Sequence, residues 1–200
     1  MLDELEKWTG DQCNKLEGVF EKRKRQARIR ECHGDCHLGN LVVINGVVTL
    51  FDCLEFDQNL RWIDVMNEVA FVYMDLLDRK QAKLARRFLN RYLELSGDYG
   101  GLYVLRFYVV YRAMVRAKVH CLRANQSGIG TDKAASLLDQ YREYLILAKQ
   151  HIGESFPAII ITHGFSGSGK TTLTQFYWNL PVLCACVRMW SVSACMVCRR

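Results

Sequence analysis

The chain has 200 residues, of which 50% are hydrophobic and 24% charged, so it can build one ordinary globular core, or one domain plus a fragment. The net charge of +6 is mild, and the basic run at residues 21–30 has no interleaved aromatic residues for base stacking, so we expect no nucleic-acid partner. The chain shows neither a signal-peptide pattern nor an apolar stretch long enough to span a bilayer, so we expect a cytoplasmic protein with free thiols and no membrane partner.

The apolar pattern predicts helices around one β-hairpin. Residues 2 to about 28 have a helical pattern rich in Glu, Lys and Arg. Two β-branched runs within residues 41–51 flank Asn45-Gly46, which is the strongest short-range signal for a two-residue hairpin turn. Apolar residues at three-and-four spacing predict further helical runs, separated by Gly-containing breaks, over residues 63–95, 102–123 and 133–152.

The most informative motif surrounds this hairpin. Asp35 lies five residues before Asn40 and seventeen before Asp52. In phosphoryl transfer one Asp orients the attacking hydroxyl and accepts its proton, while an Asn and a second Asp hold the Mg²⁺ that bridges the ATP phosphates. The hairpin would fold Asp52 back beside Asn40, so we expect oxygens of all three side chains to converge around one magnesium position. The alternative is an ordinary hairpin whose polar residues only serve its turns.

The sequence His33-Gly34-Asp35-x-His37-x-x-Asn40, followed by Phe51-Asp52, resembles the catalytic and metal loops of aminoglycoside phosphotransferase-like kinases. The continuation through residues 53–57 and 61–65 resembles the bacterial form of this family that is fused to a P-loop kinase module. The resemblance runs from about residue 28 to residue 175 and implies an α+β fold, a mostly helical kinase-like C-lobe with a catalytic hairpin. It implies ATP and Mg²⁺ as cofactors, with Asp35 as catalytic base, Asn40 and Asp52 as magnesium ligands, and His33, His37 and Asp64 as structural support.

A second motif follows a buried-strand pattern at residues 158–162. Residues 164–171 satisfy the P-loop formula, and residues 172–175 open a helix. Backbone N–H groups of such a loop cradle phosphates, Lys170 would reach the β and γ oxygens, and Thr171 would supply a hydroxyl to magnesium. This pattern predicts nucleotide binding by Gly164, Gly167, Ser168, Gly169, Lys170, Thr171 and Thr172. The alternative is a Gly/Ser linker that matches the formula by chance.

Residues 176–200 do not continue this pattern. They contain four cysteines in a CxC…CxxC arrangement whose thiolates could ligate zinc, namely Cys184, Cys186, Cys195 and Cys198. Combining the last base of each codon with the first two bases of the next permits a string that resembles the continuation of a P-loop kinase module. We therefore favour a frameshift after about residue 175 over a zinc-binding tail.

We expect three segments along the chain: a phosphotransferase-like C-lobe over residues 1–152, the start of an α/β P-loop nucleotide-binding domain over 153–175, and an aberrant tail over 176–200. Residues 1–30 have no glycine-rich lid and no strand lysine, so we expect the nucleotide-binding N-lobe to be missing. The expected function is ATP-dependent phosphorylation of a small-molecule hydroxyl, with the isolated chain inactive. The alternatives are a non-catalytic nucleotide-binding, metal-binding or regulatory module, and a zinc-binding tail protein.

Overall fold

The computed structural model describes residues 1–153, 157–165, 167–170, 172–173, 183–187 and 193–199. The chain divides into two compact units. The first unit comprises Met1–Arg79 and Gly100–Gly153, and the second comprises Lys80–Tyr99 and Glu154–Arg200. The predicted boundary at residue 152 therefore falls close to the end of the first unit, while the segment 80–99 groups with the C-terminal part of the chain.

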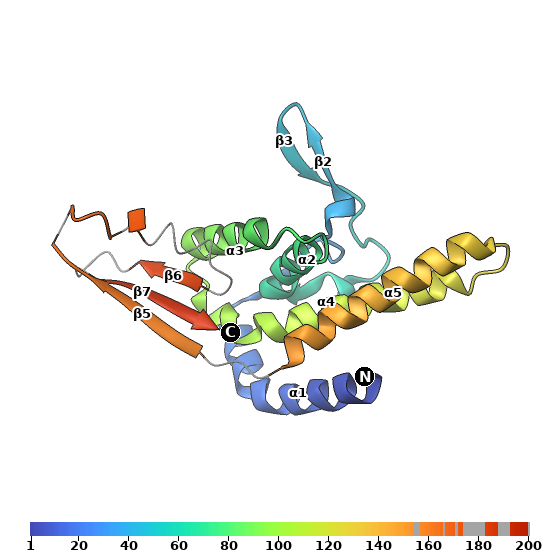
Figure 1. The fold of residues 1–200 in the computed structure, drawn as a ribbon, viewed down its shortest axis with the longest axis horizontal. Coiled ribbons are helices and arrows are strands. Elements are labelled where there is room, and N and C mark those ends of the chain that lie inside the picture. The colour runs from blue at the N-terminus through green and yellow to red at the C-terminus, as the bar shows by residue number, and fades with distance from the viewer. Residues whose placement is uncertain (154–156, 166, 171, 174–182, 188–192, 200) are drawn as a thin grey trace. The chain divides into compact units, whose positions relative to one another are not determined.

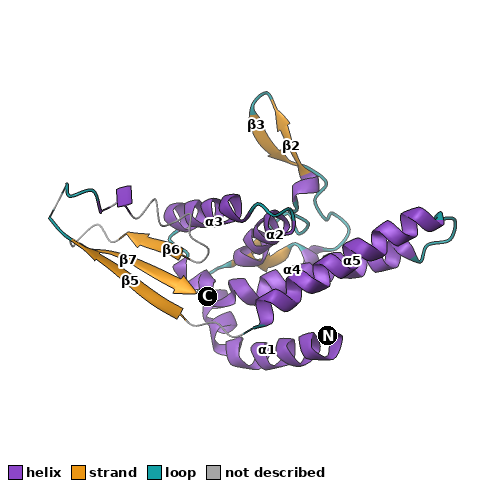
Figure 2. Ribbon diagram, in the orientation of Figure 1, coloured by secondary structure: helices purple, strands orange, loops and turns teal. Residues whose placement is uncertain are grey.

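Four α-helices build the first unit, and Figures 1 and 2 show their arrangement: α1 (Leu2–Arg25), α2 (Val65–Asp78), α4 (Leu102–Ala124) and α5 (Thr131–Ile152). Helices α4 and α5 pack along one another, and α2 packs on α4. Helix α2 is apolar around most of its circumference, which is typical of a helix that is buried on several sides. The core lies where these helices meet, and it consists of Leu5, Ala70, Phe71, Met74, Val109, Val110, Ala113, Ala117, Tyr144, Leu145, Leu147 and Ala148.

Two small antiparallel pairs of strands complete the first unit. Strand β1 (Ile29–Glu31) pairs with β4 (Trp62–Asp64), and β2 (Leu41–Ile44) pairs with β3 (Val47–Leu50). Asn45 and Gly46 both have positive φ, at 51° and 79°, as the two-residue turn requires, so the predicted hairpin is confirmed. The hairpin projects from the helices of this unit (Figure 1), and its side chains are largely exposed.

The predicted helices over residues 102–123 and 133–152 are confirmed as α4 and α5, but the single helical run predicted over 63–95 is wrong. Residues 62–64 form strand β4, and α2 ends at Asp78. Lys80 has a left-handed φ of 61°, which a continuous α-helix cannot contain. The next helix, α3 (Ala82–Ser96), begins two residues later and ends at Gly97, whose φ of 64° is typical of a helix C-terminus.

The second unit contains α3 and a three-stranded sheet. Its strands are β5 (Pro157–His163), β6 (Leu183–Val187) and β7 (Ser193–Arg199), in the order β5-β7-β6. Both pairings are antiparallel, with Ile160 opposite Met196 and Cys186 opposite Cys195. The predicted α/β domain would be built on parallel strands, and none is present among the residues that the structure describes.

The four tail cysteines lie on β6 and β7, but their side chains are outside the described part of the chain. The zinc-binding and frameshift interpretations of residues 176–200 therefore stay predictions. None of the described helices combines the length and the apolar composition that a bilayer-spanning helix needs.

Replacement of Phe71 by alanine should destabilise the first unit strongly. Phe71 is 0% exposed, and its ring lies 4.5 Å from the Arg112 guanidinium carbon and 5.6 Å from the His37 ring. Deleting a buried aromatic ring costs about 3–5 kcal/mol of unfolding free energy, which urea denaturation would measure. Val48→Thr on the exposed hairpin is the control and should change stability by less than about 0.5 kcal/mol. Equal effects of the two substitutions would contradict this packing.

Candidate active site

The loop between β1 and β2 is held in place at Gly34. Its N–H donates to Oε2 of Glu68 at 3.0 Å, and its carbonyl accepts from Nη1 of Arg112 at 2.9 Å. Gly34 has a φ of 84°, and a Cβ at this position would lie 2.9 Å from the Leu60 carbonyl oxygen and 3.0 Å from Cδ1 of Leu54. Only glycine fits this backbone conformation and this close approach, so steric constraints explain the glycine between His33 and Asp35.

Arg112 connects this loop to two helices. It belongs to α4, is 6% exposed, and donates from Nε to Oδ1 of Asn67 on α2 at 2.7 Å. Its guanidinium also lies over the Phe71 ring, an arrangement that adds a cation–π attraction. Burial lowers the pKa of the Arg112 guanidinium, and the nearby Glu68 carboxylate opposes this change. The backbone that precedes Asp35 is thus fixed by a buried, hydrogen-bonded cation.

Asp35 is held between Asn40 and His37. The Asn40 amide nitrogen donates to the Asp35 carbonyl at 3.0 Å and to its Oδ2 at 3.1 Å. Nε2 of His37 lies 3.5 Å from the same Oδ2, while Nδ1 of His37 accepts from the Gly39 N–H at 3.0 Å. That acceptor role requires an unprotonated Nδ1, so the ring proton of neutral His37 sits on Nε2 and faces Asp35. The hydrogen bond from His37 lowers the pKa of Asp35, although partial burial opposes the shift.

Asn40 is 7% exposed and ends a short 3₁₀ turn, Leu38–Asn40. This turn is fixed from α2, because the Leu38 N–H donates to Oδ2 of Asp75 at 2.8 Å. Both side-chain hydrogen bonds of Asn40 use its amide nitrogen, so Oδ1 is the atom that a metal ion would contact. The structure therefore brings together two of the three residues predicted to surround a magnesium position.

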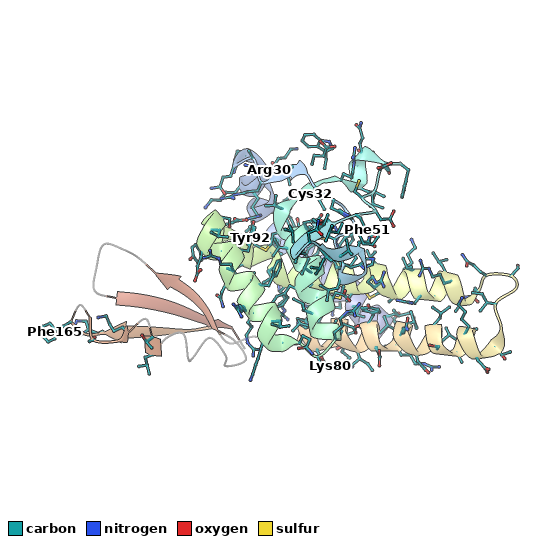
Figure 3. The ribbon with its side chains drawn as sticks, turned by 90° about the horizontal axis from the view of Figure 1, so that it is seen from above. Arg30, Cys32, Phe51, Lys80, Tyr92 and Phe165 are labelled. Atoms are coloured by element: carbon teal, nitrogen blue, oxygen red, sulfur yellow. The ribbon has the colours of Figure 1, made fainter. Side chains whose placement is uncertain are left out.

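Asp52 follows the end of β3 and is exposed, with a φ of 61°. Hydrogen bonds hold the residues on either side of it. The N–H of Phe51, which Figure 3 labels, donates to the Asn40 carbonyl at 3.1 Å, and the Phe51 carbonyl bonds Nε2 of His33 at 2.8 Å. The Leu54 N–H donates to the His33 carbonyl at 3.1 Å. The chain thus returns past Asn40 at the point where the sequence predicts the second metal ligand, and His33 joins the two segments.

Asp64 takes part in a buried ion pair. Its two carboxylate oxygens bond Nε and Nη2 of Arg23 at 2.6 and 2.7 Å, and the two side chains are only 1% and 2% exposed. Oδ1 of Asp64 also accepts from the Met66 N–H at 2.8 Å and so caps the start of α2. Asp64 therefore links α1, β4 and α2, and its role in supporting the catalytic loop stays a prediction.

Comparison with known proteins locates the family signal in this same part of the chain. Residues 4–108 match the family described as "Phosphotransferase enzyme family". The chain belongs to this phosphotransferase family. It is also similar to uncharacterized proteins of Mycobacterium tuberculosis and Mycobacterium bovis, each 36% identical over 159 residues, a match that covers 80% of this chain and 31% of the relative. The chain therefore spans about a third of the length of these curated relatives, and no solved structure matches it.

The P-loop-like segment of this phosphotransferase family member lies outside residues 4–108. Gly167 and Gly169 have positive φ, at 78° and 77°, and the Leu173 N–H donates to the Gly169 carbonyl at 2.9 Å, as in a first helical turn. Nζ of Lys170 donates to the Gly164 carbonyl at 2.7 Å, to the Phe165 carbonyl, and to Oγ of Ser168 at 3.2 Å. Thr171 is not among the described residues. The Lys170 side chain thus bonds to both Gly164 and Ser168, and Thr172 is exposed.

No group of three or more His, Cys, Asp or Glu side chains is arranged to hold a metal ion within the described part of the chain. The magnesium position predicted from sequence has only two carboxylates and one amide, so such a group is not required of it.

Sequence reasoning missed the helical residues that hold this region in place. Glu68, Asp75 and Arg112 bond the loop, and Arg23 bonds Asp64. The sequence around Arg112 could have revealed its role, because this arginine lies among apolar residues in the predicted helix 102–123, next to the core residue Ala113. A charged residue in such a run indicates a buried partner.

Breaking the buried ion pair should destabilise the protein. We expect Asp64→Asn to cost about 3–5 kcal/mol of unfolding free energy, because it leaves the Arg23 guanidinium buried without a counter-charge. Asp139→Asn is the matched control, since Asp139 pairs with Arg142 at 2.7 Å on the exposed surface of α5, where such a pair contributes less than about 1 kcal/mol. Chemical denaturation of both variants measures the difference. A loss no larger for Asp64→Asn than for the control would contradict the buried pair.

The pKa of Asp35 should rise toward its ordinary value in His37→Ala, because the substitution removes the main group that lowers it. A carboxyl with a lowered folded-state pKa stabilises the fold above its unfolded pKa of about 3.9, and this contribution is lost as the pH falls through the folded-state pKa. At neutral pH the His37→Ala variant should therefore be less stable than the wild type. As the pH is lowered, its free energy of unfolding should fall less than that of the wild type. Carboxyl ¹³C NMR titration follows Asp35 directly, and His163→Ala, in the second unit, serves as the control that leaves it unchanged.

Proposed function

We propose that this chain carries the phosphoryl-transfer loop of an ATP-dependent phosphotransferase that acts on the hydroxyl group of a small molecule. The observation that supports this most directly is the Asp35 carboxylate, oriented by Asn40 and His37 on a loop that buried groups anchor to α2 and α4. Membership of a phosphotransferase family agrees with this assignment. The use of ATP would place the reaction in the cytoplasm.

Asp35 would orient the acceptor hydroxyl and accept its proton while the hydroxyl oxygen bonds to the γ-phosphorus of ATP and the bond from that phosphorus to the β,γ-bridging oxygen breaks, which releases ADP. A carboxylate whose pKa is lowered is a weak base at neutral pH, since general-base efficiency is greatest when the pKa lies near the working pH. Its main contribution is therefore to position the hydroxyl through a strong, charge-assisted hydrogen bond. Positioning is also the larger part of catalysis in phosphoryl transfer, where the protein performs little covalent chemistry.

Asn40 and Asp52 would hold magnesium. Oδ1 of Asn40 and the Asp52 carboxylate are hard oxygen donors of the kind that Mg²⁺ prefers, and the side-chain nitrogen of Asn40 is turned toward Asp35. The ion held by these two residues would supply positive charge against the phosphates of ATP. His33 would keep Asp52 in place through its bond to the Phe51 carbonyl, and Asp64 would support the loop from β4.

A second nucleotide-phosphate site at residues 164–172 is proposed on independent grounds. The positive φ of Gly167 and Gly169 and the position of Lys170 over the loop carbonyls support it. Thr171 and Thr172 would complete this site by analogy with other P-loops.

The 200-residue chain on its own should show no measurable ATP-dependent phosphorylation of aminoglycosides or other small alcohols. Residues 1–30 form α1 and the start of β1, so this stretch provides neither a glycine-rich lid nor a strand lysine for the phosphates. Transfer of ³²P from γ-labelled ATP with Mg²⁺ measures this. The chain is compared with any longer product that genomic sequence on both sides of the coding region reveals.

That longer product should phosphorylate a small alcohol, and Asp35→Asn should lower its kcat by about 10²- to 10⁴-fold, the usual contribution of a positioned acid or base. Asp139→Asn, a surface change that removes the same charge, should leave kcat unchanged. Failure of the longer product on a broad panel of acceptors would favour a non-catalytic binding module. Turnover that is insensitive to Asp35→Asn would overturn the assignment of Asp35.

A further inference from the structure

One face of α4 carries polar residues from the catalytic loop toward the far end of the helix. Arg112, Arg116, His120 and Arg123 follow one another at spacings of four, four and three residues, which places them on a common face. Arg112 bonds the Gly34 carbonyl beside Asp35, and Arg116 lies one turn, about 6 Å, further along. After the hydrogen bond from His37, the charge of Arg116 is among the influences that lower the pKa of Asp35, which agrees with this proximity.

His120 is an unusual buried residue. It is 6% exposed, its ring stacks on Tyr144 of α5 at 5.5 Å and 15°, and Nδ1 has no hydrogen-bond partner among the described residues. The guanidinium of Arg116 lies 5.8 Å from the centre of the same Tyr144 ring, and its Nε is also buried without a partner there. Buried polar nitrogens are normally hydrogen-bonded, so two unmatched nitrogens against one aromatic ring point to a ligand group that bonds them.

The charges near this pair come from two helices. Helix α4 contributes Arg116 and Arg123, which together with burial lower the pKa of His120. The Arg116 guanidinium already bonds the Tyr144 hydroxyl, and helix α2 contributes the charges of Asp78 and Asp75, which act more weakly on Tyr144. The Asp75 carboxylate is already bonded by the Leu38 N–H and by Arg79. The unmatched Nε of Arg116 is a donor, and Nδ1 of His120 donates in one of the two neutral tautomers, so an anionic oxygen would satisfy both nitrogens.

We propose that Arg116 and His120 bind an anionic group, a phosphate or a carboxylate, on the acceptor whose hydroxyl is phosphorylated at Asp35. This inference rests on the proposed function and adds a substrate class to it. The guanidinium of Arg116 offers several donors in a planar fork that matches an oxyanion, and neutral His120 protonated at Nδ1 adds one more. A polycationic acceptor such as an aminoglycoside would instead be repelled by Arg116.

The test is a titration of the whole 200-residue chain, without ATP, with inorganic phosphate and separately with acetate. Nitrogen-15 NMR of the histidine rings reports on Nδ1 of His120, and His120→Gln assigns its signals. We expect a saturable shift with at least one of the two anions. Titration in the Lys170→Ala background should leave this shift intact, so that any phosphate bound at residues 164–172 is not mistaken for it.

Arg116→Gln should weaken this binding by at least about tenfold, as expected for losing a hydrogen bond to a charged group. Arg142→Gln removes the same charge from the exposed face of α5 and should change the affinity less than twofold. Circular dichroism verifies that each variant folds. If Arg116→Gln does not fold, Arg116→Lys replaces it in the titration. This variant should also weaken anion binding, because an ammonium group lacks the planar fork of donors.

Three results would overturn the proposal: no shift with either anion, a shift that does not saturate, or equal weakening by Arg142→Gln and Arg116→Gln. The outcome is separable from that of the proposed function. Asp35→Asn should lower the kcat of phosphoryl transfer in the longer product by about 10²- to 10⁴-fold, yet it should leave anion binding at His120 intact or tighter, because it removes a negative charge near Arg116. Saturable anion binding at His120 in a longer product that never transfers phosphate would refute only the proposed function.

Discussion

The buried guanidinium of Arg112 is the contact on which the arrangement of the site depends. It joins three pieces that are distant in sequence, namely the Gly34 carbonyl in the loop, Asn67 on α2 and the Phe71 ring in the core. A buried charge is tolerated only when its donors are used, and each bond here goes to a group that itself has a fixed position. Shifting α4 relative to α2 would therefore leave the guanidinium unsatisfied and release the loop. Core packing and the geometry of the candidate site therefore depend on the same contacts in this molecule.

This anchoring explains how a short loop can keep Asp35 in a defined orientation. Loops are ordinarily the most mobile parts of a fold, but this loop has its backbone bonded from α2 at Gly34 and Leu38 and from α4 at Gly34. The groups that touch the Asp35 carboxylate are in turn fixed, since the Gly39 N–H sets the tautomer of His37. Catalytic groups perform well when their supporting partners are held in this way, because little reorganisation is then needed at the moment of reaction.

The sequence was sufficient to predict those features that neighbouring residues in the chain determine. Asn45-Gly46 predicts its turn because few other residue pairs accept two positive φ angles, and the spacing of Asp35 and Asn40 predicts their contact because one short turn separates them. It was insufficient where the partners are far apart. Nothing near Arg23 indicates that it pairs with Asp64, forty-one residues away, and Arg112 meets Gly34 across seventy-eight residues. The break at Lys80 was also missed, since a lysine carries no intrinsic signal for a left-handed backbone.

Helix α4 links the two proposals through its geometry. Arg112 anchors the catalytic loop, Arg116 lies one turn away, and His120 lies two turns away, so the rise from the first to the last is about 12 Å. Under the two proposals, an acceptor would place its hydroxyl at Asp35 and its anionic group between Arg116 and His120, one to two helical turns beyond the residue that anchors the loop. The same helix would then fix the reacting end and the anion-binding end of the acceptor, because both are held by side chains on one face of α4.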